Sequence, residues 1–119
     1  MGQGILPHEG GFHLKEKNKH GPCLMQEGKR LTVRKRYTFT GSVQGVGLRW
    51  RAKQAAFLYD CTGWIRNEWD GSVIMEIQGR EGDITRVLES LREGRFIWIE
   101  EMEEETIPEE TGEYGFRTE

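Results

Sequence analysis

Residues 31–59 read LTVRKRYTFTGSVQGVGLRWRAKQAAFLY, and their hydrophobic period changes from two to about 3.6 across the glycine-rich turn near the middle. Before the turn, apolar and polar residues alternate, which is typical of a half-buried strand that only Lys35 interrupts. After the turn, apolar residues recur at helical spacing up to Tyr59, so we expect a helix to begin near Leu48 or Arg49. The stretch predicts a strand, a turn and a helix in succession.

The next segments predict a hairpin and a second helix. Residues 64–69 and 72–78 are rich in strand-forming residues, and Asp70-Gly71 between them favours a tight primed turn. Asp83 is a candidate helix cap, because apolar residues follow it at helical spacing until Gly94 supplies a stop.

The order of these elements predicts an α+β protein. Residues 96–99 open a further strand that runs into a glutamate-rich stretch, Pro108 and the acidic stretch favour a loop, and residues 114–116 can add a short C-terminal strand. The sequence therefore predicts a ferredoxin-like βαββαβ sandwich, with an antiparallel sheet. Right-handed crossovers would place the two helices side by side on one face and leave the other face open.

A chain of 119 residues is expected to contain one domain. Residues 1–30 show no sustained period of two or 3.6, which is typical of a flexible N-terminal arm, and residues 31–119 form the expected domain. A hydrophobic content of 35% and a mean hydropathy of -0.71 agree with part of the chain lying outside a core.

The sequence lacks the patterns that would indicate a membrane span, secretion or a metal site. An apolar run of about 18 residues and a secretory leader are both missing, so we expect a cytoplasmic protein without a membrane partner. Cys23 and Cys61 are isolated, which argues against a metal site or a redox motif. We expect no metal and no cofactor, and a monomer.

The net charge of -3 hides an asymmetry, because basic residues gather in the first third of the chain and glutamates in the last. Ordinary solvated charge is the favoured interpretation of both runs. An anionic partner for residues 15–36 and an interaction surface at residues 100–113 are the alternatives.

The turn at residues 41–49 has the properties of an anion site. Small residues let a backbone approach an anion closely, and the first amides of a helix point outward without partners. Arg49 adds a planar guanidinium that can grip two phosphate oxygens. A glycine-rich bulge with an exposed arginine is the alternative for this stretch taken alone.

Two motifs resemble the signatures of acylphosphatases. Residues 41–49 are similar to the family's loop, Gly-x-Val-Gln-Gly-Val-x-Phe-Arg, and only Leu48 departs from it. Residues 63–67, followed by Gly71-Ser72-Val73 and Gly79, resemble the second signature. The resemblance extends roughly over residues 33–116 and implies an acylphosphatase-like domain at residues 31–119.

The resemblance implies hydrolysis of small acyl phosphates to a carboxylate and inorganic phosphate. It assigns phosphoryl binding to Arg49 and placement of the attacking water to Asn67, as the catalytic residues. The other expected substrate-binding residues are Gln44, Gly45, Val46, Gly47 and Leu48. Such a reaction needs positioning and charge neutralisation more than a strong base, so neither a metal nor a covalent enzyme intermediate is expected.

Three other functions compete with hydrolysis. The main one is a non-catalytic phosphate-binding or anion-binding domain of the same fold. The second is a role like that of the acylphosphatase-like domain in hydrogenase-maturation proteins, which belong to longer chains with zinc-binding cysteine motifs. The third is nucleic-acid binding through the sheet and the basic residues 15–36, which we do not expect because the strands lack an aromatic RNA-recognition signature.

Overall fold

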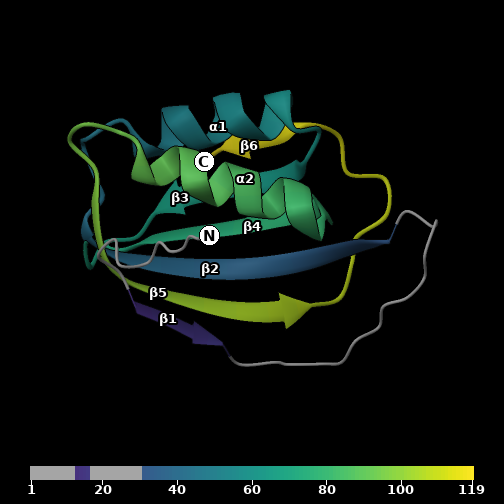
Figure 1. Cartoon of the computed structure of the whole chain (residues 1–119), viewed down its shortest axis with the longest axis horizontal. Coiled ribbons are helices and arrows are strands. Elements are labelled where there is room, and N and C mark those ends of the chain that lie inside the picture. The colour runs from purple at the N-terminus through teal and green to yellow at the C-terminus, as the bar shows by residue number, and fades with distance from the viewer. Residues whose placement is uncertain (1–12, 17–30) are drawn as a thin grey trace, which may run out of the picture.

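A computed structural model describes residues 13–16 and 31–119 of the chain (Figure 1). In chain order the elements are β1 (His13–Glu16), β2 (Thr32–Ser42), α1 (Leu48–Leu58), β3 (Thr62–Asn67), β4 (Val73–Arg80), α2 (Glu81–Arg92), β5 (Trp98–Ile107) and β6 (Phe116–Thr118). The strands form a single sheet in the order β1-β5-β2-β4-β3-β6. Within the described residues, neither helix is long and apolar enough to cross a membrane.

The four central strands form the expected ferredoxin-like core. β5, β2, β4 and β3 are neighbours in that order, and every pairing among them is antiparallel. Both helices lie on the same side of this sheet (Figure 1), so the predicted α+β sandwich is confirmed. The expected C-terminal strand is β6, which begins at Phe116 rather than at Tyr114 and pairs in parallel with β3. With β1 and β6 included, the sheet is mixed.

Four residues of the expected N-terminal arm form a strand. β1 pairs in parallel with β5, opposite residues 101–104. This corrects the expectation of an irregular arm for residues 13–16, while residues 1–12 and 17–30 lie outside the described part. A sheet edge presents a row of unpaired N–H and C=O groups, so a strand can add there through its backbone without an alternating pattern of side chains.

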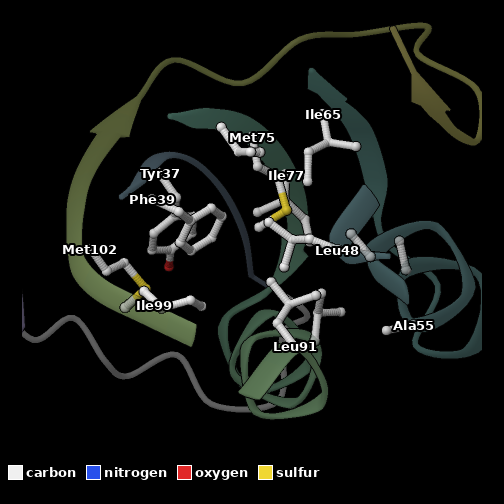
Figure 2. Packing of buried hydrophobic residues seen from close by; sticks show 14 of the residues in the cluster. Tyr37, Phe39, Leu48, Ala55, Ile65, Met75, Ile77, Leu91, Ile99 and Met102 are labelled. Atoms are coloured by element: carbon white, nitrogen blue, oxygen red, sulfur yellow. The ribbon is translucent and has the colours of Figure 1, made fainter. Parts of the chain in front are cut away.

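The hydrophobic core lies between the sheet and the two helices. Figure 2 shows Tyr37 and Phe39 of β2 and Ile77 of β4 on the same side as Leu48 of α1 and Leu91 of α2. The buried residues of α1 recur at helical spacing and are Leu48, Ala52, Ala55 and Ala56. α1 begins at Leu48, as the sequence predicts, because this apolar stripe has to face the sheet.

The start of α2 differs from the prediction. α2 begins at Glu81, its N-terminal flanking residue is Arg80, and Asp83 lies inside the first turn instead of capping it. The Glu81 carboxylate accepts a hydrogen bond from Lys35 Nζ at 2.9 Å, and the same nitrogen donates to Glu104 Oε2 at 2.6 Å. Lys35, which interrupts the apolar pattern of β2, therefore links β2 to α2 and β5 from a mostly buried position.

The acidic stretch at residues 100–105 is part of a strand and not of a loop. β5 contains five glutamates and pairs with β2 along its length. The register places Glu105 opposite Arg36, and opposite charges on paired strands stabilise a sheet. The basic neighbour explains why a glutamate-rich segment becomes a strand, and the predicted loop starts only at Pro108.

The sheet face away from the helices carries a buried charge network and is not fully open. The Arg34 side chain is 0% exposed. Its Nε donates to Glu76 Oε1 at 3.0 Å, and its Nη1 donates to Glu113 Oε1 at 2.8 Å. Arg36 Nη2 donates to the second Glu76 oxygen at 2.6 Å. Glu113 belongs to the segment between β5 and β6, so this network ties that segment to the sheet.

The Glu113 carboxyl makes the stability of the fold depend on pH. Burial raises its pKa, but hydrogen bonds from Arg34 and Thr62 and the positive charges of Arg34 and Arg117 lower it more, so the pKa lies below its ordinary value of 4.5. A depressed pKa gives stability that is complete above about pH 5 and is lost as the pH falls through the folded-state value.

We therefore expect the stability difference between the wild type and Glu113→Gln to be larger at pH 7 than at pH 3. Urea unfolding followed by circular dichroism at both pH values measures it. Glu110→Gln is the control, because Glu110 is exposed and contacts Gln78 through its backbone. A difference that stayed constant between the two pH values would contradict a depressed pKa for Glu113.

Candidate active site

The loop between β2 and α1 has a backbone conformation that needs glycine. Gly45 has φ of 73° and Gly47 has φ of 87°, and both angles lie in the left-handed region that side chains disfavour. A Cβ atom at either position would meet no atom within 4 Å, so the requirement is conformational and not steric. α1 starts directly after Gly47 without a side-chain cap. The first amides of the helix are therefore available to an anion.

Asn67 is the last residue of β3, and its side chain lies on the helix side of the sheet. Side chains alternate along a strand, so Asn67 shares a face with the buried Ile65, while Arg66 points to the opposite face. Asn67 Oδ1 is a buried acceptor without a hydrogen-bond partner among the described residues. Buried polar atoms are nearly always hydrogen-bonded, so an orphan acceptor calls for a ligand or a water molecule.

A pocket of about 160 Å³ joins the loop to Asn67. Its lining residues are Val43, Gly45, Gly47, Leu48, Arg49, Trp50 and Asn67. About 10–15 Å³ of such space holds one water molecule, so the pocket has room for a phosphoryl group and a water beside it. Arg49 is the one ionisable side chain in this lining. Together with the start of α1, it gives the pocket a positive potential.

Arg49 is anchored by the C-terminal segment. Its Nη1 donates to the main-chain oxygen of Glu119 at 3.0 Å, and the Glu119 N–H donates to the Ile65 carbonyl at 2.8 Å. β6, which precedes Glu119, pairs with β3. A guanidinium has five N–H donors, so the remaining donors of Arg49 stay available to a ligand.

A second pocket, of about 170 Å³, lies at the other end of the sheet. Its lining residues are Thr32, Asp60, Gly79, Arg80 and Asp83. β2 pairs with β4 such that Thr32 faces Arg80 at this end and Phe39 faces Val73 at the end near Asn67. Two carboxylates against one guanidinium make this pocket a poor site for an anion. The pocket beside Arg49 is therefore the better candidate.

The remaining residues expected at the site have different positions. Gly45, Gly47 and Leu48 line the pocket with Arg49 and Asn67, although the Leu48 side chain is buried in the core. Val46 packs against the core and is outside the lining. Gln44 is also outside the lining, and its side-chain amide donates to two carbonyls of the β3–β4 loop.

Sequence reasoning missed two lining residues, Val43 and Trp50, and the anchor at Glu119. Trp50 follows Arg49 in the first turn of α1, and that adjacency could have drawn attention to it. Its side chain is 65% exposed, so it lies at the pocket's outer edge. Nothing in the sequence motif indicates Glu119, because only the pairing of β6 with β3 brings it near Arg49.

Comparison with known proteins agrees with the two motifs. The family model described as Acylphosphatase matches residues 35–118, which include the loop, Asn67 and β6. The chain belongs to the acylphosphatase family. An acylphosphatase of Oceanobacillus iheyensis is 40% identical over 73 residues, which are 60% of this chain and 80% of that protein. An acylphosphatase of Clostridium acetobutylicum is 37% identical over 78 residues, 65% of this chain and 86% of the relative.

A solved structure agrees as well. The acylphosphatase structure from Coxiella burnetii matches with a TM-score of 0.67 and 28% identity, and the match covers 81% of this chain and 100% of that chain. The acylphosphatases are hydrolases that act on acid anhydrides, and membership places this chain among them. It does not favour the alternative of a non-catalytic anion-binding domain.

Proposed function

We propose that the chain hydrolyses the carboxyl–phosphate bond of small acyl phosphates in the pocket between the β2–α1 loop and Asn67. Family membership supports this reaction. The pocket lining supports it as well, because Arg49 is its one charged side chain and the other lining residues are uncharged. The observation that carries the mechanism is the orphan acceptor Asn67 Oδ1, which is buried within the same pocket as Arg49.

The first step is binding of the phosphoryl group. The amides that start α1 donate to its oxygens, and the free donors of Arg49 neutralise its charge. The hydrogen bond from Arg49 Nη1 to Glu119 fixes the guanidinium before the substrate enters. Such preorganised donors are worth more in the transition state than flexible ones, because no reorganisation is needed when charge develops.

The second step is delivery of water. Asn67 Oδ1 accepts a hydrogen bond from the water. This hydrogen bond orients the water so that a lone pair of the water oxygen points toward phosphorus. The water oxygen bonds to phosphorus as the bond from phosphorus to the acyl oxygen breaks, and the carboxylate leaves with the electron pair. The proton of the water passes to a phosphoryl oxygen. A carboxylate is a good leaving group, so alignment provides most of what the reaction requires.

Asn67→Ala should lower kcat for benzoyl phosphate about a hundredfold, because it removes the group that aligns water. Inhibition by inorganic phosphate should change little, since the loop and Arg49 remain. Initial rates of benzoyl phosphate loss, with and without phosphate, measure both quantities. Arg66→Ala is the matched control, because Arg66 precedes Asn67 on β3 and points to the opposite face.

Two outcomes would contradict the role given to Asn67. One is a folded Asn67→Ala protein with a wild-type kcat and wild-type inhibition by phosphate. The other is an unchanged kcat combined with much weaker inhibition by phosphate, which would make Asn67 a ligand of the phosphoryl group instead of the water.

We also propose that the enzyme acts as a cytoplasmic monomer with no nucleic-acid partner, in which residues 31–119 form the domain and β1 adds to its strand β5. Support for a reducing compartment comes from Cys61, a buried thiol that is free among the residues the structure describes. Support for a monomer comes from β1 and β6, which cover the two edges of the central strands. A mass measurement in solution that found a dimer would contradict the second point.

A further inference from the structure

The Gln44 side chain connects the two halves of the pocket. Its Nε2 donates to the Glu68 carbonyl at 2.7 Å and to the Ser72 carbonyl at 2.9 Å. Gln44 directly precedes Gly45 in the β2–α1 loop, which is called the phosphate loop below, and Glu68 directly follows Asn67. One side-chain amide therefore joins the segment that would hold the phosphoryl group to the segment that would hold the water.

The carbonyls that Gln44 contacts also close the β3–β4 loop. The Glu68 N–H donates to the Ser72 carbonyl at 2.8 Å, and the Gly71 N–H donates to the Glu68 carbonyl at 3.1 Å. Asp70 Oδ1 accepts from the Ser72 N–H at 2.9 Å and from its hydroxyl at 2.7 Å. The loop thus holds its own shape, and Gln44 supplies the second hydrogen bond to each of its two closing carbonyls.

These contacts account for the residue type at position 44. Two carbonyl oxygens need two donors from a neutral group that reaches both, and a primary amide has two N–H groups on one nitrogen. A carboxylate of the same length would face two carbonyls without a donor. Because both donors are engaged with the β3–β4 loop and Gln44 does not line the pocket, its side chain is not a substrate ligand.

We propose that Gln44 is a positioning residue that sets the separation between the phosphate loop and Asn67. This inference rests on the proposed function, because it assigns the two ends of the link to phosphoryl binding and water alignment. Without the link, each half keeps its own hydrogen bonds, so phosphate still binds but water is no longer held in line. The effect should therefore fall on kcat and not on phosphate affinity.

The test compares Gln44→Glu with Gln78→Glu. Gln78 is the matched control, because its side-chain amide also bonds a backbone segment, at Glu110, but on the sheet face away from the pocket. At pH 8 we expect Gln44→Glu to lower kcat for benzoyl phosphate about tenfold, since a misplacement of about 1 Å can cost about a hundredfold and a smaller shift costs less. Inhibition by inorganic phosphate should stay within about twofold of the wild type in the neutral Gln44→Met variant, which adds no negative charge beside the anion site. Gln78→Glu should change neither.

A pH profile separates positioning from simple loss of structure. At low pH the carboxyl introduced by Gln44→Glu is protonated and can donate one hydrogen bond again. The ratio of its kcat to that of the wild type should therefore rise as the pH falls from 8 to 5. Gln44→Met, a neutral side chain of similar length without donors, should show the same loss at pH 8 and no such recovery.

The possible results distinguish a positioning role of Gln44 from its alternatives. A wild-type kcat for Gln44→Glu and Gln44→Met at pH 8 overturns the proposal, and so does a loss in Gln44→Met that is confined to phosphate affinity. If both variants are unfolded by circular dichroism, Gln44 supports the fold as a whole, and the proposal is again overturned. A wild-type protein that releases no phosphate from any acyl phosphate would contradict the proposed function itself, whatever the Gln44 variants do.

Discussion

Arg49→Ala should lower kcat/KM for benzoyl phosphate at least about a hundredfold while leaving the fold intact. A hundredfold corresponds to about 3 kcal/mol of transition-state stabilisation, which is typical for the loss of one principal donor from a preorganised site. Arg49 is the one ionisable side chain in the pocket lining, so no neighbour in that lining can replace its charge. Steady-state rates of benzoyl phosphate hydrolysis measure the change.

The variant should also bind inorganic phosphate much more weakly, in contrast to Asn67→Ala. Lys53→Ala is the matched control, because it removes one positive charge from an exposed position of the same helix. Arg49→Lys should recover only part of the activity, since an ammonium keeps the charge but not the planar fork. A folded Arg49→Ala protein within about threefold of wild-type kcat/KM would exclude Arg49 from phosphoryl binding, given the hundredfold loss expected.

Arg34→Met should lower the free energy of unfolding by about 3–5 kcal/mol, which is the usual result of removing one partner from a buried ion pair. The Arg34 side chain is 0% exposed, and the side chains of Glu76 and Glu113 are each 7% exposed. Without the guanidinium, Glu113 would be left buried with a hydrogen bond from Thr62 and with Arg117, at 3.8 Å, as its charged partner. A domain of this size is typically stable by about 5–15 kcal/mol, so the variant should lose a large share of its total stability.

Urea unfolding at pH 7 measures this change. Arg36→Met is the matched control, because Arg36 is on the same strand and face, also binds Glu76, and is 46% exposed. Its loss should lower the free energy of unfolding by less than about 1 kcal/mol, as for other exposed pairs. Equal losses for the two variants would show that burial of Arg34 has no special importance.

The fold was predictable where local chemistry and burial agree. The period of two in β2 and the helical spacing in α1 come from residues that must face the same core, so Phe39 and Leu48 reveal their elements directly. The β3–β4 hairpin also follows from its residues. Its loop differs in detail, because the Glu68 N–H bonds to the Ser72 carbonyl and leaves three residues between them, where Asp70-Gly71 predicts two.

The charged parts of the chain were less predictable, because their partners are far away in sequence. Neither solvated charge nor an external partner describes Lys35, which bonds Glu81 and Glu104, or Arg34, which bonds Glu113. The basic residues of β2 and acidic residues near the end of the domain pair with each other. A linear reading of charge cannot find such a pairing without the sheet register.

The candidate site shows the same contrast between residues that a local motif indicates and residues that depend on distant contacts. Arg49 and Asn67 come from two recognisable motifs, and the structure brings both to one pocket. The roles assigned to them stay predictions. Glu119 and the contacts of Gln44 carry no local signal, because each depends on how β6 or the β3–β4 loop packs against a distant segment.

The pairing of β2 with β5 also bears on how the chain folds. Partners such as Thr38 and Glu103 are far apart in sequence, so the last central strand has to close a long loop, and closures of this kind slow folding. Until β5 pairs with it, β2 presents unpaired N–H and C=O groups along one edge. The five glutamates of β5 disfavour its pairing with a second copy of itself, while the basic residues of β2 attract it. The charges that pair in the finished sheet therefore also favour the pairing of β5 with β2 over the pairing of two copies of β5.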